Sequence, residues 1–107
     1  MLAKQFRLPA SLRLNGFHTI RQSAFLVKYQ HNTLPNSRFG FVVSKKIDKR
    51  ASARNRVKRM ARARIEKKWL ATKGYDVLFV FQAAIVRQTP QDIAQALDSV
   101  MADIQKS

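Results

Sequence analysis

The side chains of this chain that are best suited to chemistry are lysines and arginines concentrated in one segment. Between Lys45 and Lys68 there are twelve Lys or Arg residues and two acids, Asp48 and Glu66, so this segment accounts for ten of the fifteen net positive charges. Like charges repel one another along a chain, and a bound polyanion relieves that repulsion while it releases its own counterions. Arginine predominates within Arg50–Arg62, and its planar fork suits bidentate contacts with phosphate. The pattern therefore indicates a nucleic acid as the partner.

Few groups in the sequence could cleave a bond or hold a metal. Protein nucleases that use Mg²⁺ need clustered carboxylates, and the six acids are spread along the chain. We interpret Asp92, Asp98 and Asp103 as solvated residues of one helix. His18 and His31 could form an acid–base pair, but each lies near a predicted turn, which favours a surface role. With no cysteine either, the sequence predicts no catalytic residue and no metal ligand in the protein.

Composition indicates one folded domain. The chain has 107 residues, 46% of them hydrophobic, with seven Phe and one Trp, which is enough to bury a single modest core. The first 44 residues contain no acid and the last 39 contain four, so we expect the C-terminal part to be scaffold and the rest to be binding surface. No segment has the apolar length of a signal peptide or a membrane span. The absence of cysteine fits a reducing compartment.

Several segments have the pattern of β-strands. Residues His18–Tyr29 and Arg38–Lys45 read as extended, and the segment 31–37 between them has the composition of a turn. An antiparallel hairpin of these two segments is the simplest arrangement. The nearly continuous apolar run in Asp76–Gln82 is typical of a central strand that is buried on both faces.

The sequence predicts two long helices in its second half and a short helical turn near the N-terminus. Residues Ala51–Leu70 have helical periodicity, and we expect Gly74 to terminate that helix. Thr89 is a suitable N-cap for a final helix over Pro90–Gln105. Leu8–Leu14 could form a short helical turn. The final helix is expected to bury Ile93, Ala96 or Leu97, Val100, Met101 and Ile104.

The basic segment also has a specific spacing. Ser44-Lys45-Lys46 is followed seven residues later by Arg54-Asn55-Arg56-x-Lys58-Arg59-x-x-Arg62, and Arg38-Phe39-Gly40-Phe41-Val42-Val43 comes before it. This arrangement resembles the signature of the protein component of bacterial ribonuclease P. The similarity covers about Ser23 to Ile104, which is most of the chain.

The resemblance implies both a fold and a function. The implied fold is α+β, a small sandwich of a four-stranded mixed sheet with helices in the order αβββαβα, with a left-handed βαβ crossover that departs from the usual rule. The implied function is that of a protein subunit of ribonuclease P, in which an RNA subunit removes the 5′ leader of precursor tRNA with Mg²⁺. The protein would be an accessory subunit of this endoribonuclease, a hydrolase, and would bind no cofactor by itself. Its partners would be the catalytic RNA and precursor tRNA, in a cytoplasmic complex of one protein with one RNA.

The resemblance and the basic segment together define a predicted RNA-binding surface within a single RNA-binding domain, residues 1–107. Asn55 lies between two arginines, where its amide could bond a base edge, a sugar or a phosphate, although an amide near a helix start is also often a cap or merely exposed. The predicted surface comprises Lys45, Lys46, Arg50, Arg54, Asn55, Arg56, Lys58, Arg59 and Arg62.

One departure concerns the leader-binding cleft that the resemblance implies between the sheet and an N-terminal helix. Here Leu12-Arg13-Leu14 runs almost directly into Asn15-Gly16, so that helix is shortened and its usual aromatic residues are missing. Phe17 or Phe6 could substitute by stacking on an unpaired base, or both could be core residues. Lys28, on the polar side of its strand, is a further candidate for leader contact.

Two other classes of protein share some of these features. A ribosomal protein has similar charge and size but does not need the spacing of Ser44-Lys45-Lys46 and Arg54-Asn55-Arg56. A DNA-binding module places a recognition helix in the major groove, usually within an all-helical or dimeric frame. The buried strand expected around Val77–Phe81 disfavours that second alternative.

Overall fold

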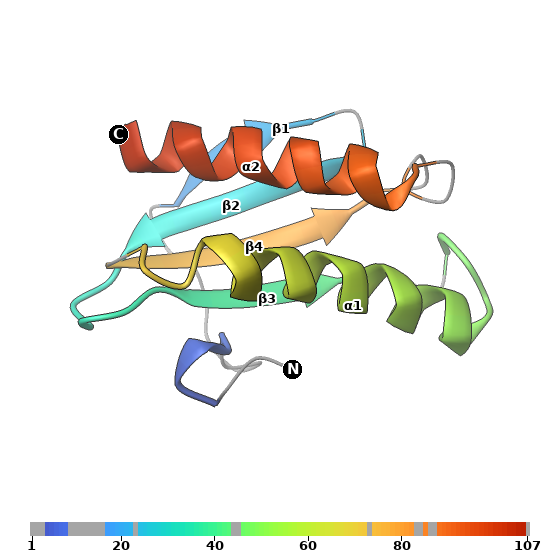
Figure 1. Ribbon diagram of the computed structural model, residues 1–107, viewed down its shortest axis with the longest axis horizontal. Coiled ribbons are helices and arrows are strands. Elements are labelled where there is room, and N and C mark those ends of the chain that lie inside the picture. The colour runs from blue at the N-terminus through green and yellow to red at the C-terminus, as the bar shows by residue number, and fades with distance from the viewer. Residues whose placement is uncertain are drawn as a thin grey trace.

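The computed structural model describes residues 4–8, 17–22, 24–43, 46–72, 74–82, 85 and 88–106. It is an α+β structure, as predicted, with one four-stranded mixed sheet and two α-helices (Figure 1). Its elements, in chain order, are the 3₁₀ helix η1 (Lys4–Phe6), β1 (His18–Arg21), β2 (Phe25–His31), β3 (Arg38–Val42), α1 (Ala51–Lys68), β4 (Tyr75–Phe81) and α2 (Pro90–Lys106).

The sheet has the strand order β1-β2-β4-β3, which differs from the predicted hairpin. β4 lies between β2 and β3, antiparallel to the first and parallel to the second. The connection from β2 to β3 bonds the start of β4 instead of closing a hairpin: Asn32 donates its backbone N–H to the Gly74 carbonyl (2.8 Å), and the Tyr75 N–H donates to the Ser37 hydroxyl (3.1 Å). The hairpin prediction for these two strands is therefore wrong.

The actual hairpin lies earlier in the chain. The predicted single strand His18–Tyr29 is two antiparallel strands, β1 and β2, paired from His18 with Tyr29 to Arg21 with Leu26. The backbone N–H of Gln22 donates to the Phe25 carbonyl (2.9 Å) and closes the turn between them. The parallel neighbours β3 and β4 are joined through α1, as a βαβ unit requires. The left-handed sense of that crossover stays a prediction.

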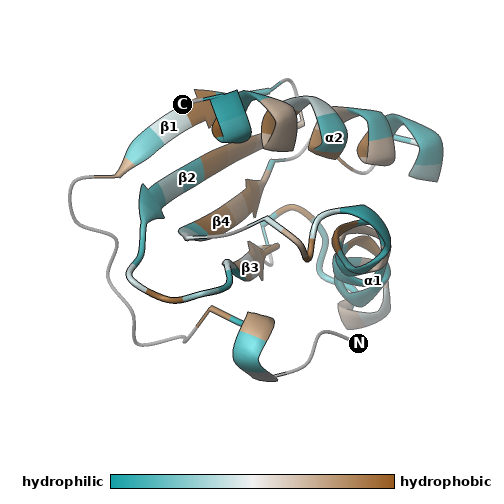
Figure 2. Cartoon of the chain, turned by 60° about the vertical axis from the view of Figure 1, so that its left-hand side comes forward, coloured by the Kyte–Doolittle hydropathy of each residue, from teal (hydrophilic) through white to brown (hydrophobic). Residues whose placement is uncertain are grey.

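Both α-helices pack on the same face of the sheet (Figures 1 and 2). In β2 and β4 alternate residues are buried on this face, and α1 and α2 cover them. Leu97, not Ala96, is fully buried in α2, together with the other four predicted residues. The central strand β4 is less buried than predicted on its second face, where Leu78 and Val80 stay half-exposed, because both α-helices lie on the first face.

Of the two predicted helix ends, the N-terminal cap of α2 is confirmed and the C-terminal stop of α1 is wrong. Thr89 caps α2 as predicted: its hydroxyl accepts the Asp92 N–H (3.1 Å), and the Asp92 carboxylate accepts the Thr89 N–H (3.1 Å). α1 ends at Lys68, so Gly74 does not terminate it; the Trp69 N–H closes the last turn on the Ile65 carbonyl (2.8 Å). Gly74, with φ +80°, instead shapes the entry to β4.

The N-terminal segment is described only in part. The predicted turn Leu8–Leu14 lies almost entirely outside the described residues. η1 precedes it, Arg7 forms a parallel bridge with Phe39, and the Leu8 N–H donates to the Phe39 carbonyl (2.9 Å). These bonds place the N-terminal segment along the free edge of β3. In the part of the chain that the structure describes, no helix is long and apolar enough to cross a membrane.

Candidate nucleic-acid interface

The loop before α1 is fixed by two of the predicted arginines. The Asp48 carboxylate accepts the backbone N–H of Arg50 (2.9 Å) and two bonds from its guanidinium (3.2 and 3.0 Å). These hydrogen bonds lower the pKa of Asp48 to about 2. Arg54 donates from Nη1 to the carbonyls of Asp48 (2.8 Å) and Lys49 (3.0 Å). Arg50 and Arg54 thus hold the start of the helix, and the guanidinium of Arg54 is partly committed to the protein itself.

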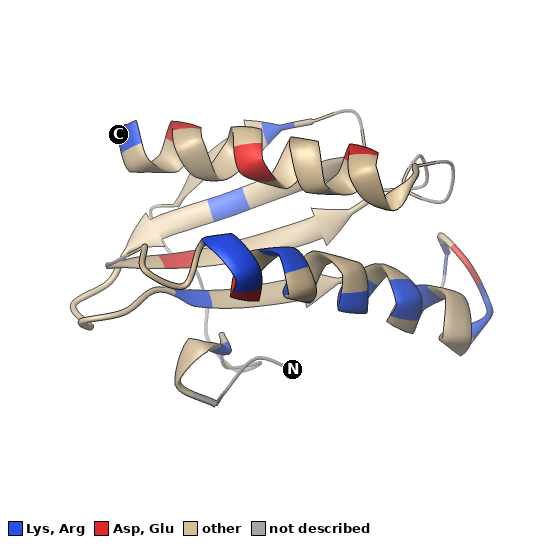
Figure 3. Cartoon of the chain, viewed as in Figure 1, with Lys and Arg blue, Asp and Glu red and all other residues tan. Residues whose placement is uncertain are grey.

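A second set of predicted residues lies on α1, the helix on which many of the Lys and Arg positions lie (Figure 3). Among the described residues, the side chains of Asn55, Arg56, Lys58 and Arg59 make no hydrogen bond or ion pair, and all but the half-buried Lys58 are exposed. Asn55 is therefore not a cap. Arg62 is steadied by one bond from its Nε to the Lys58 carbonyl (3.3 Å). These are the side chains that a phosphate backbone could contact with little rearrangement.

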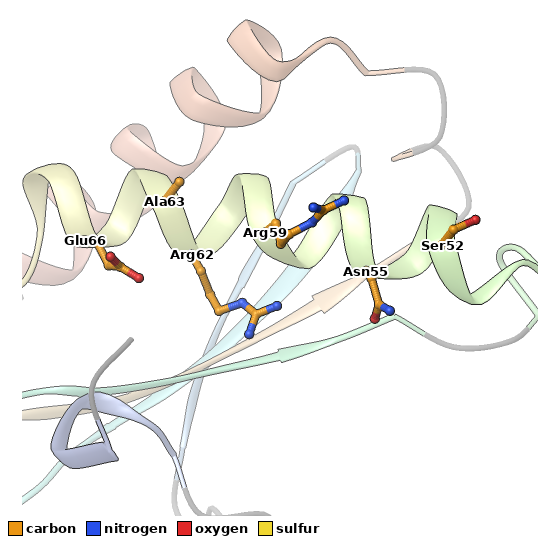
Figure 4. A pocket seen from close by; sticks show the side chains of 6 residues that line it. All are labelled: Ser52, Asn55, Arg59, Arg62, Ala63 and Glu66. Atoms are coloured by element: carbon orange, nitrogen blue, oxygen red, sulfur yellow. The ribbon is translucent and has the colours of Figure 1, made fainter. Parts of the chain in front are cut away.

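A groove of about 860 Å³ runs along α1 (Figure 4). Asn55 and Arg62 project from the same side of the helix there. It is lined by Ser52, Asn55, Arg59, Arg62, Ala63 and Glu66. A smaller groove of about 200 Å³ is lined by Lys58 and Arg62 of α1, Phe39, Gly40 and Phe41 of β3, and Arg7 and Leu8 of the N-terminal segment. The cationic surface of α1 therefore continues onto the edge of the sheet.

Two predicted residues of this surface, Lys45 and Lys46, come before α1. Lys46 is exposed in the loop before α1. Lys45 lies outside the described residues.

The two residues predicted to contact a leader lie together on the other face of the sheet. Lys28 is paired with Thr19 on one side and Leu78 on the other, and its Nζ lies 5.0 Å from the ring centroid of Phe17. Phe17 is 40% exposed, so its ring is open to solvent as well as to the lysine. Phe6, the alternative, packs against the core. Sequence spacing did not predict the contact between Phe17 and Lys28, because the β1–β2 register that creates it was not recognised.

An ion pair that sequence reasoning missed lies at one end of the same open face. Asp76 is only 2% exposed and accepts two bonds from the Arg38 guanidinium (2.8 and 2.7 Å) and one from the Asn32 amide (2.9 Å). Burial raises the pKa of Asp76, but the hydrogen bonds from Arg38 and Asn32 outweigh it, so that the pKa is lowered. The only sequence signal was an isolated acid at the head of an apolar strand.

The prediction of a surface position is confirmed for the two histidines but is wrong for one of the acids. His18 and His31 are both exposed, as predicted, and their rings lie against Tyr29 and Tyr75. Asp98 was predicted to be solvated, which is wrong: its carboxylate is bonded to side chains of the α1 segment, Arg64 among them. Where the structure describes the chain, no three His, Asp or Glu side chains gather in a way that could hold a metal ion.

A known protein family matches most of this chain. A family model described as Ribonuclease P matches residues 14–105. The chain belongs to the ribonuclease P protein family. The family resemblance predicted from the signature around Arg54-Asn55-Arg56 is thereby confirmed.

Two relatives in the ribonuclease P family, both called ribonuclease P protein component, illustrate the match. The protein of Azoarcus sp. (strain BH72) is 33% identical over 73% of this chain and 65% of the relative. The protein of Marinomonas sp. (strain MWYL1) is 32% identical over 77% of this chain and 62% of the relative. The chain therefore matches slightly less than two thirds of the length of these relatives.

Solved structures of ribonuclease P proteins share the fold. A mutant ribonuclease P protein of Staphylococcus aureus has a TM-score of 0.77 at 24% identity, over 84% of this chain and 76% of that chain. The ribonuclease P protein of Thermotoga maritima has a TM-score of 0.73 at 22% identity, over 80% of this chain and 82% of that chain. At this level of identity the likeness concerns the fold, and it agrees with the predicted α+β class.

Proposed function

We propose that this chain is the protein subunit of a ribonuclease P, which binds the catalytic RNA and the 5′ leader of precursor tRNA. It would promote Mg²⁺-dependent removal of the leader, so that the mature 5′ end of the tRNA is formed. The observation that supports this most is that, among the described residues, the side chains of Asn55, Arg56, Lys58 and Arg59 make no hydrogen bond or ion pair, in a member of the ribonuclease P family. In this proposal the protein is an accessory subunit of a ribonucleoprotein endoribonuclease, a hydrolase, in the cytoplasm.

The α1 surface would bind the catalytic RNA through its phosphates and sugars. Arg56 and Arg59 are exposed and can each place a forked donor on phosphate oxygens, while Asn55 can bond a neutral sugar or base edge. Neutralising phosphates releases condensed counterions, so affinity should fall steeply with salt. The core side of α1 is fixed by Val57, Ala61 and Ile65, and this supports a rigid presentation of these groups.

The open face of the sheet would bind the leader. Phe17 offers a ring on which an unpaired base can stack, and Lys28 beside it offers a charge to the neighbouring phosphate. Leu78 and Val80 give this face an apolar floor next to Lys28. Arg38 is less available for this role, because Asp76 holds its guanidinium.

The chemical step would belong to the RNA. A hydroxide would attack the scissile phosphodiester, the bond from phosphorus to the 3′ oxygen of the leader would break, and the leader would leave with a 3′ hydroxyl. RNA-bound Mg²⁺ would supply activation of the hydroxide and stabilisation of the developing charge. Oxygen ligands are the ones Mg²⁺ prefers, and RNA phosphates provide them. Of the acids in the described residues, Asp48, Asp76 and Asp98 are each committed to an arginine, so we assign this chain no resident metal. The protein would contribute affinity and positive potential, as one protein molecule on one RNA.

Reconstitution tests the proposal. The protein is added to a bacterial ribonuclease P RNA at low Mg²⁺, and cleavage of a precursor tRNA is followed by the release of its leader. We expect no cleavage by the protein alone and a clear stimulation of the RNA, larger at low than at high Mg²⁺. Cleavage by the protein without RNA would overturn the proposal that the RNA performs the chemical step. A lack of both binding and stimulation would overturn the proposed function altogether.

A further inference from the structure

A single carboxylate of α2 joins the two helices. Asp98 Oδ1 accepts bonds from Arg64 Nε (2.9 Å) and from the indole Nε1 of Trp69 (2.9 Å), and its Oδ2 accepts a bond from Arg64 Nη2. Lys68 Nζ lies 3.6 Å from the same Oδ2. Trp69 itself is buried, 8% exposed, at the point where α1 ends. One acid of α2 thus contacts three side chains at the C-terminal end of α1.

The cations that Asp98 engages lie on a different side of α1 from Asn55, Arg59 and Arg62. A helix advances by roughly 100° per residue, which puts Arg64 and Lys68 side by side. The same rule puts Arg59 and Arg62 together on the nearly opposite side. Asp98 therefore fixes one side of the helix and leaves the other side open.

The bonds to Asp98 are of a kind that sets orientation. Two parallel bonds from one guanidinium define both the distance and the plane of the contact, and the indole bond defines a second direction. The hydrogen bond from Arg64 lowers the pKa of Asp98 to about 2, so the carboxylate is charged throughout the neutral range. A charged acceptor with three donors restrains the roll of α1 against α2 more tightly than apolar packing alone, which tolerates sliding.

From this geometry, and resting on the proposed function, we infer that Asp98 is a positioning residue for RNA recognition. It fixes the roll of α1 so that Asn55, Arg56 and Arg59 meet the RNA in one orientation. It also withholds Arg64 and Lys68 from indiscriminate contact with phosphate. Asp98 would therefore act on selectivity between RNAs more than on the general affinity for polyanions.

The test compares Asp98→Asn with Asp103→Asn. Both substitutions remove one negative charge from α2 and keep the size of the side chain, and Asp103 is exposed five residues away. The affinity of each full-length variant is measured for a ribonuclease P RNA and for an unrelated structured RNA of equal length, at several salt concentrations. Cooperative thermal unfolding is recorded for each.

We expect Asp103→Asn to bind both RNAs as well as, or slightly better than, the starting protein. Asp98→Asn should keep or increase its affinity for the unrelated RNA, because Arg64 and Lys68 are released. Its affinity for the ribonuclease P RNA should fall roughly tenfold, as expected for the loss of a well-formed charge-assisted contact. The ratio of the two affinities is the readout that a merely structural role would not move.

Two results would overturn the inference. Asp98→Asn could follow Asp103→Asn for both RNAs, which would show that only charge matters. Alternatively, it could lose both RNAs in proportion, which would show that Asp98 serves general stability. If Asp98→Asn does not unfold cooperatively, Arg64→Lys is used instead, because it keeps the charge but cannot form both parallel bonds; it should lower the same ratio. A starting protein that binds neither RNA would refute the proposed function, and the inference that rests on it would fall with it; this outcome differs from the two above, in which the starting protein binds.

Discussion

Arg54 and Arg56 belong to the same signature, yet the structure predicts different consequences for removing them. Arg54→Ala removes two charge-assisted bonds to the carbonyls of Asp48 and Lys49. Such bonds are worth about 1.5–3 kcal/mol each when buried, but this side chain is half-exposed and the carbonyls can be rehydrated, so we expect a loss of about 1–2 kcal/mol in total. For a domain of this size the loss corresponds to a drop in melting temperature of roughly 5–10 °C.

Arg56→Ala should have the opposite profile. Its side chain is exposed and has no partner among the described residues, so the free energy of unfolding should change by less than about 0.5 kcal/mol. The melting temperature should therefore change little. If Arg56 contacts one phosphate, the slope of log affinity against log salt for the ribonuclease P RNA should become shallower by about 0.7–0.9.

The assay is thermal unfolding of both variants together with RNA binding at four or more salt concentrations. Arg54→Ala should melt earlier and keep most of the salt slope, while Arg56→Ala should keep its melting temperature and lose part of the slope. Equal melting temperatures for the two variants would refute the structural role of Arg54. An unchanged slope in Arg56→Ala would refute the assignment of a phosphate contact to that residue.

Three further predictions concern other parts of the molecule. The pKa of Asp98 is lowered to about 2, from about 3.9 in the unfolded chain. Its contribution to the free energy of unfolding should therefore be complete above about pH 5 and lost as the pH falls from about 4 to 2. The free energies of unfolding of the starting protein and of Asp98→Asn, measured by urea titration, should converge at low pH. Gly40→Ala puts a methyl group 3.1 Å from Leu78 Cδ1 and 3.2 Å from Leu8 Cδ2, so it should destabilise the protein by about 1 kcal/mol. Leu8→Ala in the same chain removes Cδ2 and should recover part of that loss in denaturant unfolding. Phe17→Ala should weaken binding of a precursor tRNA to the reconstituted holoenzyme by about 5- to 100-fold, the equivalent of one stacked base, and leave the affinity for mature tRNA unchanged; an equal loss for both RNAs would contradict a leader contact.

The sequence predicted the elements of this fold better than their arrangement. Periodicity and capping signals are local, so the start of α1 at Ala51 and the cap of α2 at Thr89 could be predicted from short windows. The position of β4 between β2 and β3 depends on bonds between segments about forty residues apart, such as the one from Tyr75 to Ser37. No local pattern encodes such a contact, and the nearest-neighbour hairpin was the natural but wrong expectation.

For the candidate site, the types of the residues could be predicted from the sequence, but not which side chains are bonded to other groups of the protein. The cationic residues of α1 are evident in the sequence, and the family match confirms the signature to which they belong. What the sequence could not show is that Arg54 bonds its own backbone while Arg56 points into solvent, because both are arginines two positions apart. Asp98 was misjudged for the same reason, since its partners lie on another helix.

Three of the six acids of this strongly basic protein lie where elements meet. Asp48 bonds Arg50 in the loop that leads into α1, Asp76 bonds Arg38 between two strands, and Asp98 bonds an arginine across the two helices. Each of these three carboxylates therefore neutralises a cation at a junction of the scaffold. A protein with a net charge of +15 would otherwise be pushed apart by its own field at these junctions. Placing these three acids at the junctions stabilises the frame that presents α1, whereas Glu66 is the acid that lines the groove on α1 itself.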